Sequence, residues 1–270
     1  MKLNKVYEGN CVDLATQLAD ESVRLIVCSP PYAMQRQKLY GGISEKEYPA
    51  WTVEWMEAFR KKLTFDGSIF IVIREHIQNG EISDYVLKTR LAARGAGWIE
   101  PETLIWHKPD APPLGSIYRP RRNWEYVLWY SKSRKPFANL KNCGNEKSTR
   151  VGGFAGSNRF GEGGNSPIAA KQNRSLKKGT SRCSDVISAT IGSIDAGISH
   201  PAMYPQGIPD FLILTFSEEN DLVVDPFSGS GQTGLAALRR KRKFFGCEIS
   251  AEYCSIANDR LEKFFQKNEF

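Results

Sequence analysis

The sequence feature that most constrains the fold is a short apolar run that stops abruptly at two prolines. The run VRLIVC, at residues 23–28, has the composition of a buried strand. Pro30 and Pro31 prevent its continuation, because proline has no N–H to donate to a β-ladder. Ser29 and Tyr32 are then expected at the carboxyl edge of a sheet, where open α/β folds bind their ligands. The competing interpretation is a rigid Pro-Pro loop with a surface tyrosine.

Strands and helices alternate along most of the chain, which predicts an α/β fold. A short strand, a turn and a helical turn are expected within residues 6–18, and further strands at 67–73, 102–107, 123–131, 221–227 and 244–249. Apolar side chains spaced by three and four predict a helix at 48–63, and further helices are expected at 85–91, 208–216, 233–238 and 251–265. The expected sheet is mostly parallel and twisted, with helices on both faces. The aromatic-rich segments 102–107 and 123–131 should form its only antiparallel pair.

Residues 133–199 interrupt this alternation. They contain eight glycines between Gly144 and Gly179 and only weak apolar periodicity. The net charge of +7 is concentrated here, because the stretch from Lys132 to Arg182 has twelve Lys or Arg and two acidic residues. This composition fits either a disordered linker or a loop-rich insert that recognises a partner. We expect a basic insert at 133–199 between two parts of one domain, at 1–132 and 200–270.

Several classes of protein are excluded by composition. The amino-terminal segment lacks an apolar core, and no stretch approaches the roughly 18 consecutive apolar residues of a membrane span. We therefore expect a cytoplasmic protein that does not contact membranes. The six cysteines never form a CxxC pair, and the chain has three histidines, which predicts reduced thiols and no metal site.

A second constellation lies near the carboxyl end, where DPFSGSGQTG at 225–234 places a glycine turn between a strand and a helix. Gly229, Gly231 and Gly234 satisfy the GxGxxG spacing, and Glu248 ends the next expected strand. Such a turn admits a ribose-containing cofactor, because glycines allow close approach and an acidic residue accepts from ribose hydroxyls. An ordinary βα turn and a nicotinamide-binding site are the alternatives. The nicotinamide fingerprint normally opens a βαβαβ half, whereas fewer than forty residues follow it here.

Together these motifs resemble the S-adenosylmethionine-dependent DNA amino-methyltransferases, in which SPPY is the catalytic motif and DPFSGSG the cofactor loop. The motif order resembles their circularly permuted β group. GNCVDL at 9–14 is similar to the turn that contacts the cofactor adenine, although Asn10 stands where relatives usually have Asp. WEYVLWYSK at 124–132 resembles the motif beside the target base, and HPAMYPQGIP at 200–209 resembles the element that precedes the helix closing over the methionine end.

The resemblance implies a Rossmann-like methyltransferase fold, S-adenosyl-L-methionine as cofactor and double-stranded DNA as substrate. It implies catalytic roles for Ser29, Pro30, Pro31 and Tyr32. Ser29 Oγ and the Pro30 carbonyl would accept the amino hydrogens of a flipped base, and Tyr32 would stack on that base. The implied cofactor contacts are Asn10, Cys11, His200, Pro201, Asp225, Pro226, Phe227, Ser228, Gly229, Ser230, Gly231, Thr233 and Glu248.

Basic residues are expected to contact DNA phosphates. They are Arg119, Arg121, Arg122, Lys141, Lys147, Arg150, Arg159, Lys171, Arg174, Lys177 and Lys178. A homodimer and a cognate restriction endonuclease are further expected partners, in a restriction-modification or phage context.

The sequence constrains the type of reaction more closely than it constrains the atom that is methylated. Serine at the first position of the catalytic motif resembles the cytosine-N4 enzymes, whereas Asp or Asn is commoner in the adenine-N6 enzymes. Methylation at cytosine C5 needs a nucleophilic cysteine, which relatives present as Pro-Cys, and the sequence contains no such dipeptide. We expect cytosine N4, with adenine N6 as the alternative. An RNA or protein-amide methyltransferase and a non-enzymatic DNA-binding protein are the remaining alternatives.

Overall fold

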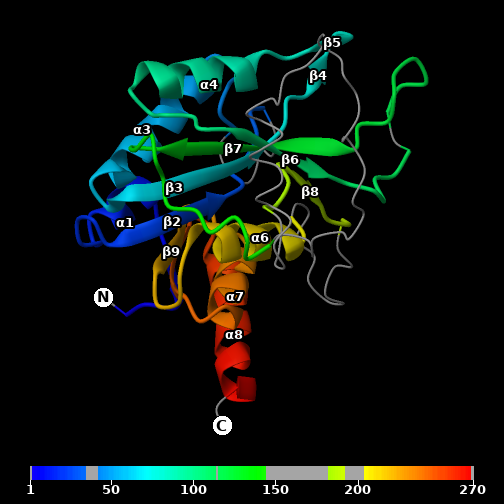
Figure 1. The fold of residues 1–270 in the computed structure, drawn as a ribbon. Helices are drawn as coiled ribbons and strands as arrows, with labels where there is room; N and C mark the ends of the chain where they lie inside the picture. Colours follow the sequence, from blue (N-terminus) through cyan, green and yellow to red (C-terminus); the bar gives the residue numbers. More distant parts are fainter. Residues whose placement is uncertain (1, 35–41, 114, 144–181, 192–203, 269–270) are drawn as a thin grey trace, which may run out of the picture.

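The computed structural model describes residues 2–34, 42–113, 115–143, 182–191 and 204–268. Within these residues, eight strands form one sheet in the order β1-β10-β9-β2-β3-β7-β6-β8 (Figure 1). The strands are β1 (Lys5–Glu8), β2 (Val23–Cys28), β3 (Leu63–Ile73), β6 (Thr103–His107), β7 (Trp124–Ser131), β8 (Val186–Ser188), β9 (Leu222–Asp225) and β10 (Lys243–Glu248). A separate hairpin joins β4 (Ile77–Gln78) to β5 (Glu81–Ile82).

The sheet is mostly parallel, as predicted, but the expectation of a single antiparallel pair is wrong. Among the described strands, β7 runs antiparallel to both of its neighbours, β3 and β6, so the sheet contains two antiparallel pairs. Every other neighbouring pair is parallel. The sequence showed that β6 and β7 are joined by a Pro-rich connection, but it gave no signal for the partner on the far side of β7.

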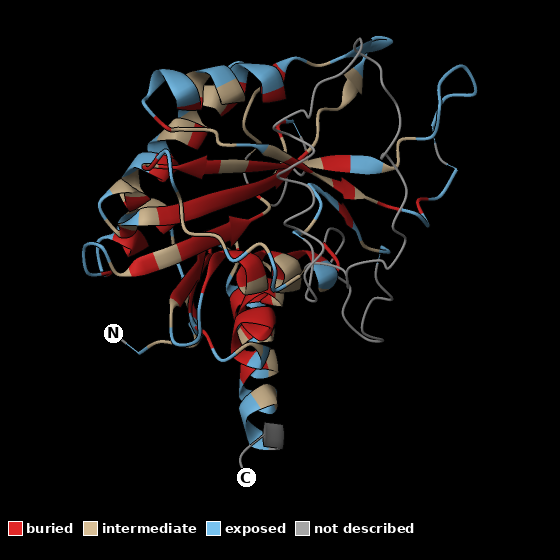
Figure 2. Cartoon of the chain, in the orientation of Figure 1, coloured by how far each residue is buried: buried red, intermediate tan, exposed pale blue. Residues whose placement is uncertain are grey.

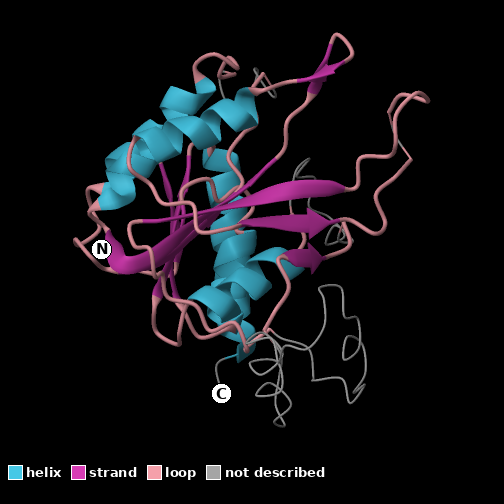
Figure 3. Ribbon diagram, turned by 45° about the horizontal axis from the view of Figure 1, so that its top comes forward, coloured by secondary structure: helices cyan, strands magenta, loops and turns pink. Residues whose placement is uncertain are grey.

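Helices cover both faces of the sheet (Figure 3). One face carries α1 (Cys11–Ala15), α3 (Tyr48–Arg60) and α4 (Tyr85–Gly95), and the other carries α6 (Gly207–Phe216), α7 (Gln232–Arg239) and α8 (Ala251–Asn268). Residues of the central strands are buried (Figure 2). In β2, Ile26 and Cys28 pack toward α1 and α3, whereas Leu25 and Val27 pack toward α6 and α7. A strand that must be apolar on both sides explains the unbroken apolar run in the sequence.

Three helices end three or more residues from their predicted ends, and one of them, α8, continues past 265 to Asn268. The helix expected at 48–63 ends at Arg60, and Leu63 begins the eleven-residue strand β3. Leu63 continues the helical apolar spacing, so periodicity alone could not place this boundary. The helix that starts at Tyr85 extends to Gly95, and the left-handed residue that follows it is Gly97, with φ +87°.

The described parts of the expected insert include residues 182–191, which contribute β8. This strand pairs in parallel with β6 and extends the sheet at one edge. Residues 144–181 and 192–199 lie outside the described part of the chain. None of the described helices combines the length and apolar character needed to cross a bilayer.

Candidate active site

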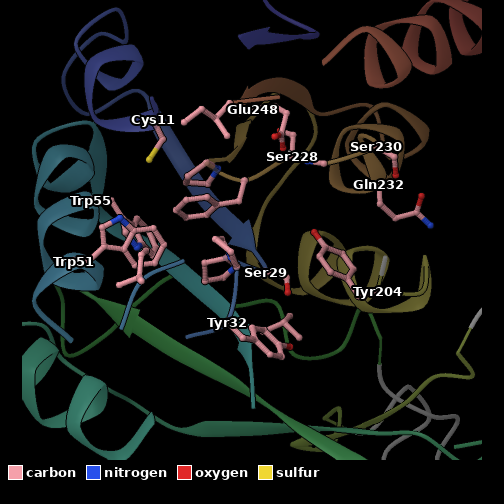
Figure 4. Close-up of a pocket in the computed structure, with 18 of the residues that line it drawn as sticks. Cys11, Ser29, Tyr32, Trp51, Trp55, Tyr204, Ser228, Ser230, Gln232 and Glu248 are labelled. Carbon is pink, nitrogen blue, oxygen red and sulfur yellow. Dashed lines mark hydrogen bonds between the residues drawn. The ribbon is translucent and has the colours of Figure 1, made fainter. Parts of the chain in front are cut away.

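The predicted catalytic motif, residues 29–32, and the glycine turn meet at one edge of the sheet. Strands β2 and β9 are neighbours and run in parallel, so their carboxyl ends lie side by side. The residues that follow them, Ser29–Tyr32 and Pro226–Ser230, line a cavity of about 530 Å³. The chain continues from β2 to β3 on one side of this point and from β9 to β10 on the other. α/β folds characteristically form a ligand crevice at such a switch point. Segments almost two hundred residues apart therefore form one site (Figure 4).

The end of the cavity made by residues 226–230 and Glu248 is called here the glycine-turn end. Gly229 and Gly231 have φ values of +48° and +83°, in the left-handed region that favours glycine. The Gly229 N–H donates to Glu248 Oε2 at 2.8 Å, and the Ser250 N–H donates to Oε1 at 2.9 Å. Burial raises the pKa of Glu248 above its ordinary value, and hydrogen bonds from these backbone amides oppose that effect. The carboxylate therefore ties the glycine turn to the end of β10.

Asp225 lies directly behind this turn and is 1% exposed. Its carboxylate accepts from the Thr233 hydroxyl, from the Phe227 N–H at 3.0 Å and from the Tyr204 hydroxyl at 3.4 Å. Burial raises the pKa of Asp225 from 3.8 to about 7, against the lowering effect of the Thr233 hydrogen bond. Asp225 and Thr233 thus support the turn from inside and do not line the cavity.

The turn after β1 contributes Asn10 and Cys11 to the cavity wall. The Asn10 side chain accepts from the Val12 N–H at 2.9 Å, so it caps the start of α1. Burial raises the pKa of the Cys11 thiol to about 12, which keeps it protonated and unreactive near neutral pH.

Helix α3 supplies an aromatic wall to the cavity, whereas the sequence predicted only a helix in this segment. Trp51 and Trp55 each lie with ring centroids 5.4 Å from that of Phe227, and all three side chains line the cavity. Both tryptophans point from α3 toward the cavity (Figure 4). Their spacing of four residues signals a shared helix face but does not distinguish a core from a binding wall.

The opposite end of the cavity, called here the tyrosine end, is formed by Tyr32, Trp106, Lys108 and Glu125. Tyr32 is half-buried, and its hydroxyl donates to Glu125 Oε2 at 2.6 Å. The Lys108 ammonium pairs with Glu125 Oε1. Burial and, after it, the negative charge of Glu125 raise the pKa of Tyr32 well above its ordinary value. The Tyr32 hydroxyl is therefore a hydrogen-bond donor at any physiological pH.

The structure brings most of the predicted site residues together. Those that line the cavity are Asn10, Cys11, Ser29, Pro30, Pro31, Tyr32, Pro226, Phe227, Ser228, Gly229, Ser230 and Glu248. Three others, Asp225, Gly231 and Thr233, do not line it. Gly231 instead packs against α8, where a Cβ on it would lie 3.0 Å from Ala257 Cβ. His200 and Pro201 lie outside the described residues.

Some described lining residues were not predicted individually but lie within the motifs quoted at 9–14, 124–132, 200–209 and 225–234. These are Gly9, Val12, Glu125, Tyr204 and Gln232. Sequence reasoning missed the rest of the lining among the described residues, which are Ile43, Trp51, Glu54, Trp55, Val72, Trp106, Lys108, Ile191 and Ile249.

The predicted DNA contacts are described only in part. Arg121 donates to the Ala111 carbonyl at 3.0 Å within the connection between β6 and β7, and Arg122 donates to the Glu75 carbonyl at 2.7 Å, which ties that connection to the segment after β3. Arg119 donates to the Gly80 carbonyl at 2.9 Å but remains exposed, as does Lys141. The other predicted basic contacts, Lys147, Arg150, Arg159, Lys171, Arg174, Lys177 and Lys178, lie outside the described residues.

Comparisons with known proteins agree with this geometry. A family model described as DNA methylase matches residues 23–259. The type II methyltransferase M.PvuII of Proteus hauseri is 28% identical over 284 residues, which cover 95% of this chain and 83% of that protein.

Solved structures show the same fold. The PvuII DNA methyltransferase, described as cytosine-N4-specific, superimposes with a TM-score of 0.71 at 23% identity, covering 97% of this chain and 91% of the other. The complex of M1.HpyAVI with S-adenosylmethionine gives a TM-score of 0.62 at 19% identity, covering 95% and 98%. The predicted Rossmann-like methyltransferase fold is confirmed.

Proposed function

We propose that this chain, which belongs to the DNA methylase family of N6- and N4-directed methyltransferases, methylates the N4 atom of cytosine in DNA. The family establishes an S-adenosylmethionine-dependent DNA amino-methyltransferase, and the proposal concerns the target atom and the residues that act on it. The observation that carries it is the position of Ser29, which lies between the glycine-turn end and the tyrosine end of one cavity (Figure 4).

The glycine-turn end suits the cofactor. Gly229 lines the cavity without a side chain, and Glu248 offers carboxylate oxygens to ribose hydroxyls. Trp51, Trp55 and Phe227 provide apolar surface for an aromatic ring. S-adenosylmethionine supplies a methyl group on a sulfonium sulfur. We propose that these residues, with Asn10, Cys11, Pro226, Ser228 and Ser230, hold it, while Asp225, Gly231 and Thr233 stabilise the turn from behind.

Ser29 and Pro30 would act on the target amino group. An exocyclic amino nitrogen is a weak nucleophile, because its lone pair is delocalised into the ring. Hydrogen bonds from its two hydrogens to Ser29 Oγ and the Pro30 carbonyl would favour a tetrahedral nitrogen with an available lone pair. Pro30 and Pro31 fix the direction of that carbonyl, and a preorganised dipole is a large catalytic factor.

Tyr32 would hold the base itself. A base inside a duplex is out of reach, so the target nucleotide must leave the helix at a cost of a few kcal/mol. Stacking on an aromatic side chain returns about 1–3 kcal/mol per base. Tyr32 is anchored at the end of the cavity away from the glycine turn, so its ring is available as a platform for an everted base.

Cytosine is favoured over adenine by two observations. Serine occupies the first position of the catalytic motif, and the relative described as cytosine-N4-specific superimposes over 97% of this chain. Adenine N6 is the second candidate, because the matching family model covers both kinds of enzyme.

DNA would lie across the mouth of the cavity. Exposed Arg119 and Lys141, with the basic residues of the proposed recognition insert at 133–199, would contact its phosphates, so affinity should fall steeply with added salt. The parts at 1–132 and 200–270 would form the single methyltransferase domain. Relatives described as type II methyltransferases support a restriction-modification role with a cognate endonuclease, and light scattering would test for a homodimer.

The decisive experiment incubates unmethylated genomic DNA with the protein and S-adenosylmethionine, followed by mass spectrometry of the nucleosides. N4-methylcytosine is the expected product. N6-methyladenine would transfer the assignment to adenine, and the absence of both, in a preparation that binds the cofactor, would reject the function. Sequencing that detects modified bases then gives the recognition sequence.

A further inference from the structure

The tyrosine end contains a buried ion pair at a position where the fold alone would favour apolar residues. The side chains of Lys108 and Glu125 are 11% and 10% exposed. Glu125 alternates with Tyr126 and so shares the face of β7 that Val127 presents to the core. Burying two charges carries a large desolvation cost, and apolar residues of similar size usually stabilise a fold as well or better. The pair therefore points to a role beyond stability.

The two Glu125 oxygens serve different partners. Oε1 accepts from the Lys108 ammonium, and Oε2 accepts from the Tyr32 hydroxyl at 2.6 Å. Lys108 follows Trp106 by two positions, and its ammonium lies 4.1 Å from the centroid of the Trp106 ring. The contacts run in sequence from Trp106 through Lys108 and Glu125 to Tyr32, and all four side chains line the cavity.

Tyr32 needs such an anchor because of where it sits. It follows the end of β2 by four residues and has left the sheet, so no backbone ladder fixes its position. Its ring is restrained instead at its far end, by a charge-assisted hydrogen bond to a carboxylate on β7, which is a central strand of the sheet. Lys108 balances the charge of that carboxylate, so the wall that faces an uncharged base carries no net charge.

We propose that Glu125 is a positioning residue for methyl transfer, which orients the Tyr32 ring as the platform for the target base, and that Lys108 holds Glu125 in place. The proposal rests on the proposed function, since it assumes that Tyr32 stacks on the base. It assigns Glu125 and Lys108 no contact with the reacting atoms. Their loss should impair capture of the base and leave binding of the cofactor unchanged.

The test is a double-mutant cycle on single-turnover methylation of an oligonucleotide that carries the mapped recognition sequence. Tyr32→Phe keeps the ring and removes the hydroxyl, and Glu125→Gln keeps the shape and removes the charge. Each should slow methyl transfer roughly 10- to 100-fold, the size expected for one lost charged hydrogen bond. If Glu125 acts through Tyr32, the double variant should be no slower than the slower single variant. Multiplied effects would overturn the proposal.

A matched control is available outside the cavity. Glu100 is also a buried carboxylate, with a side chain 7% exposed and paired with Arg90 at 2.8 Å, but it does not line the cavity. Glu100→Gln should leave the rate within about twofold of wild type, because Glu100 does not line the cavity. A loss equal to that of Glu125→Gln would attribute the effect to general destabilisation and contradict the proposal.

A second variant separates folding from positioning. The combined substitution Lys108→Met and Glu125→Met keeps comparable volume and removes both buried charges. It should unfold at a temperature no lower than wild type and bind S-adenosylmethionine within about twofold, yet methylate slowly. A fast variant would overturn the proposal. Wild-type protein that binds the cofactor but methylates no DNA would instead reject the proposed function, so the two failures are distinguishable.

Discussion

The two ends of the cavity are built by different means. The glycine-turn end is held by backbone conformation and by amides that donate to Glu248, within the short span of 225–250. The tyrosine end is held by side chains from separate strands, with Tyr32 and Glu125 ninety-three residues apart. A site made from backbone leaves its signature within one short segment. At the tyrosine end each segment has its own motif, at 29–32 and 124–132, but the sequence does not show which side chains meet.

The contrast also predicts different consequences of mutation. Substitutions at the glycine-turn end should act on cofactor affinity and stability, because that end is part of the strand–turn–helix framework. Substitutions at the tyrosine end should act on turnover, because those side chains can be changed without moving the backbone. Each experiment below would strengthen or break this division.

The largest effect is expected for Tyr32→Ala, which removes both the stacking surface and its anchor. Loss of stacking alone is worth about 1–3 kcal/mol, and misplacement of the base adds to it, so turnover should fall roughly a thousandfold. Methylation kinetics at saturating DNA measure the loss. Cofactor affinity, measured by calorimetric titration, should remain within about twofold of wild type. A weaker cofactor complex with unchanged turnover would contradict this division, because it would assign cofactor binding to the tyrosine end.

The pH dependence of folding stability should reveal the titration of Asp225, the buried carboxyl group behind the glycine turn. Its pKa is raised by burial from 3.8 to about 7, so between these values the folded protein binds more protons than the unfolded chain. Stability must then decrease as pH rises through this window and level off above about pH 7, by up to roughly 4 kcal/mol from this group. Thermal unfolding between pH 4 and 8 measures the trend.

Asp225→Asn provides the control for that trend, because it cannot ionise. The variant should lose much of the pH dependence over the same window and become more stable relative to wild type as pH rises. Burial raises the pKa of Glu248 in the same direction, so some dependence should persist. An unchanged profile in the variant would show that Asp225 does not titrate in this range.

Glu248→Gln should weaken the cofactor complex roughly 10- to 100-fold, since a charged acceptor contributes about 1.5–3 kcal/mol to its hydrogen bonds. Turnover at saturating S-adenosylmethionine should change much less, because Glu248 lies at the opposite end from Tyr32 (Figure 4). A calorimetric titration and a rate at saturation separate the two effects. A large loss of rate with intact affinity would contradict the division between the ends.

The sequence predicted more of the fold than of the site. The apolar runs predicted the strands β2, β3, β9 and β10, because strands buried on both faces consist mostly of apolar residues. The glycine turn and SPPY also predicted one shared edge. The antiparallel contact of β7 with β3 was missed, because strand order depends on packing between distant segments.

The same limit applied to individual side chains. Trp51 and Trp55 have the spacing of an ordinary core helix, and nothing local shows that part of that face borders a cavity. Lys108 follows a strand without any motif around it, and its pairing with Glu125 exists only once β6 and β7 align. The motif marked Thr233 for the cofactor, and the sequence did not show that its hydroxyl donates to Asp225 behind the turn.

The smallest effects should come from three glycines that separate backbone strain from crowding. Gly231 has φ +83° and would place a Cβ 3.0 Å from Ala257 Cβ, Gly97 has φ +87° with open space, and Gly95 has open space at the end of α4. Left-handed backbone costs a residue with a Cβ roughly 1–2 kcal/mol, so alanine should destabilise at Gly97 and somewhat more at Gly231. At Gly95 it should be neutral or slightly stabilising. Denaturant unfolding of the three variants measures their free energies of unfolding and gives the order directly. Equal losses of stability at Gly97 and Gly231 would mean that α8 moves away from the added Cβ at no cost. Backbone conformation alone would then maintain the glycine-turn end.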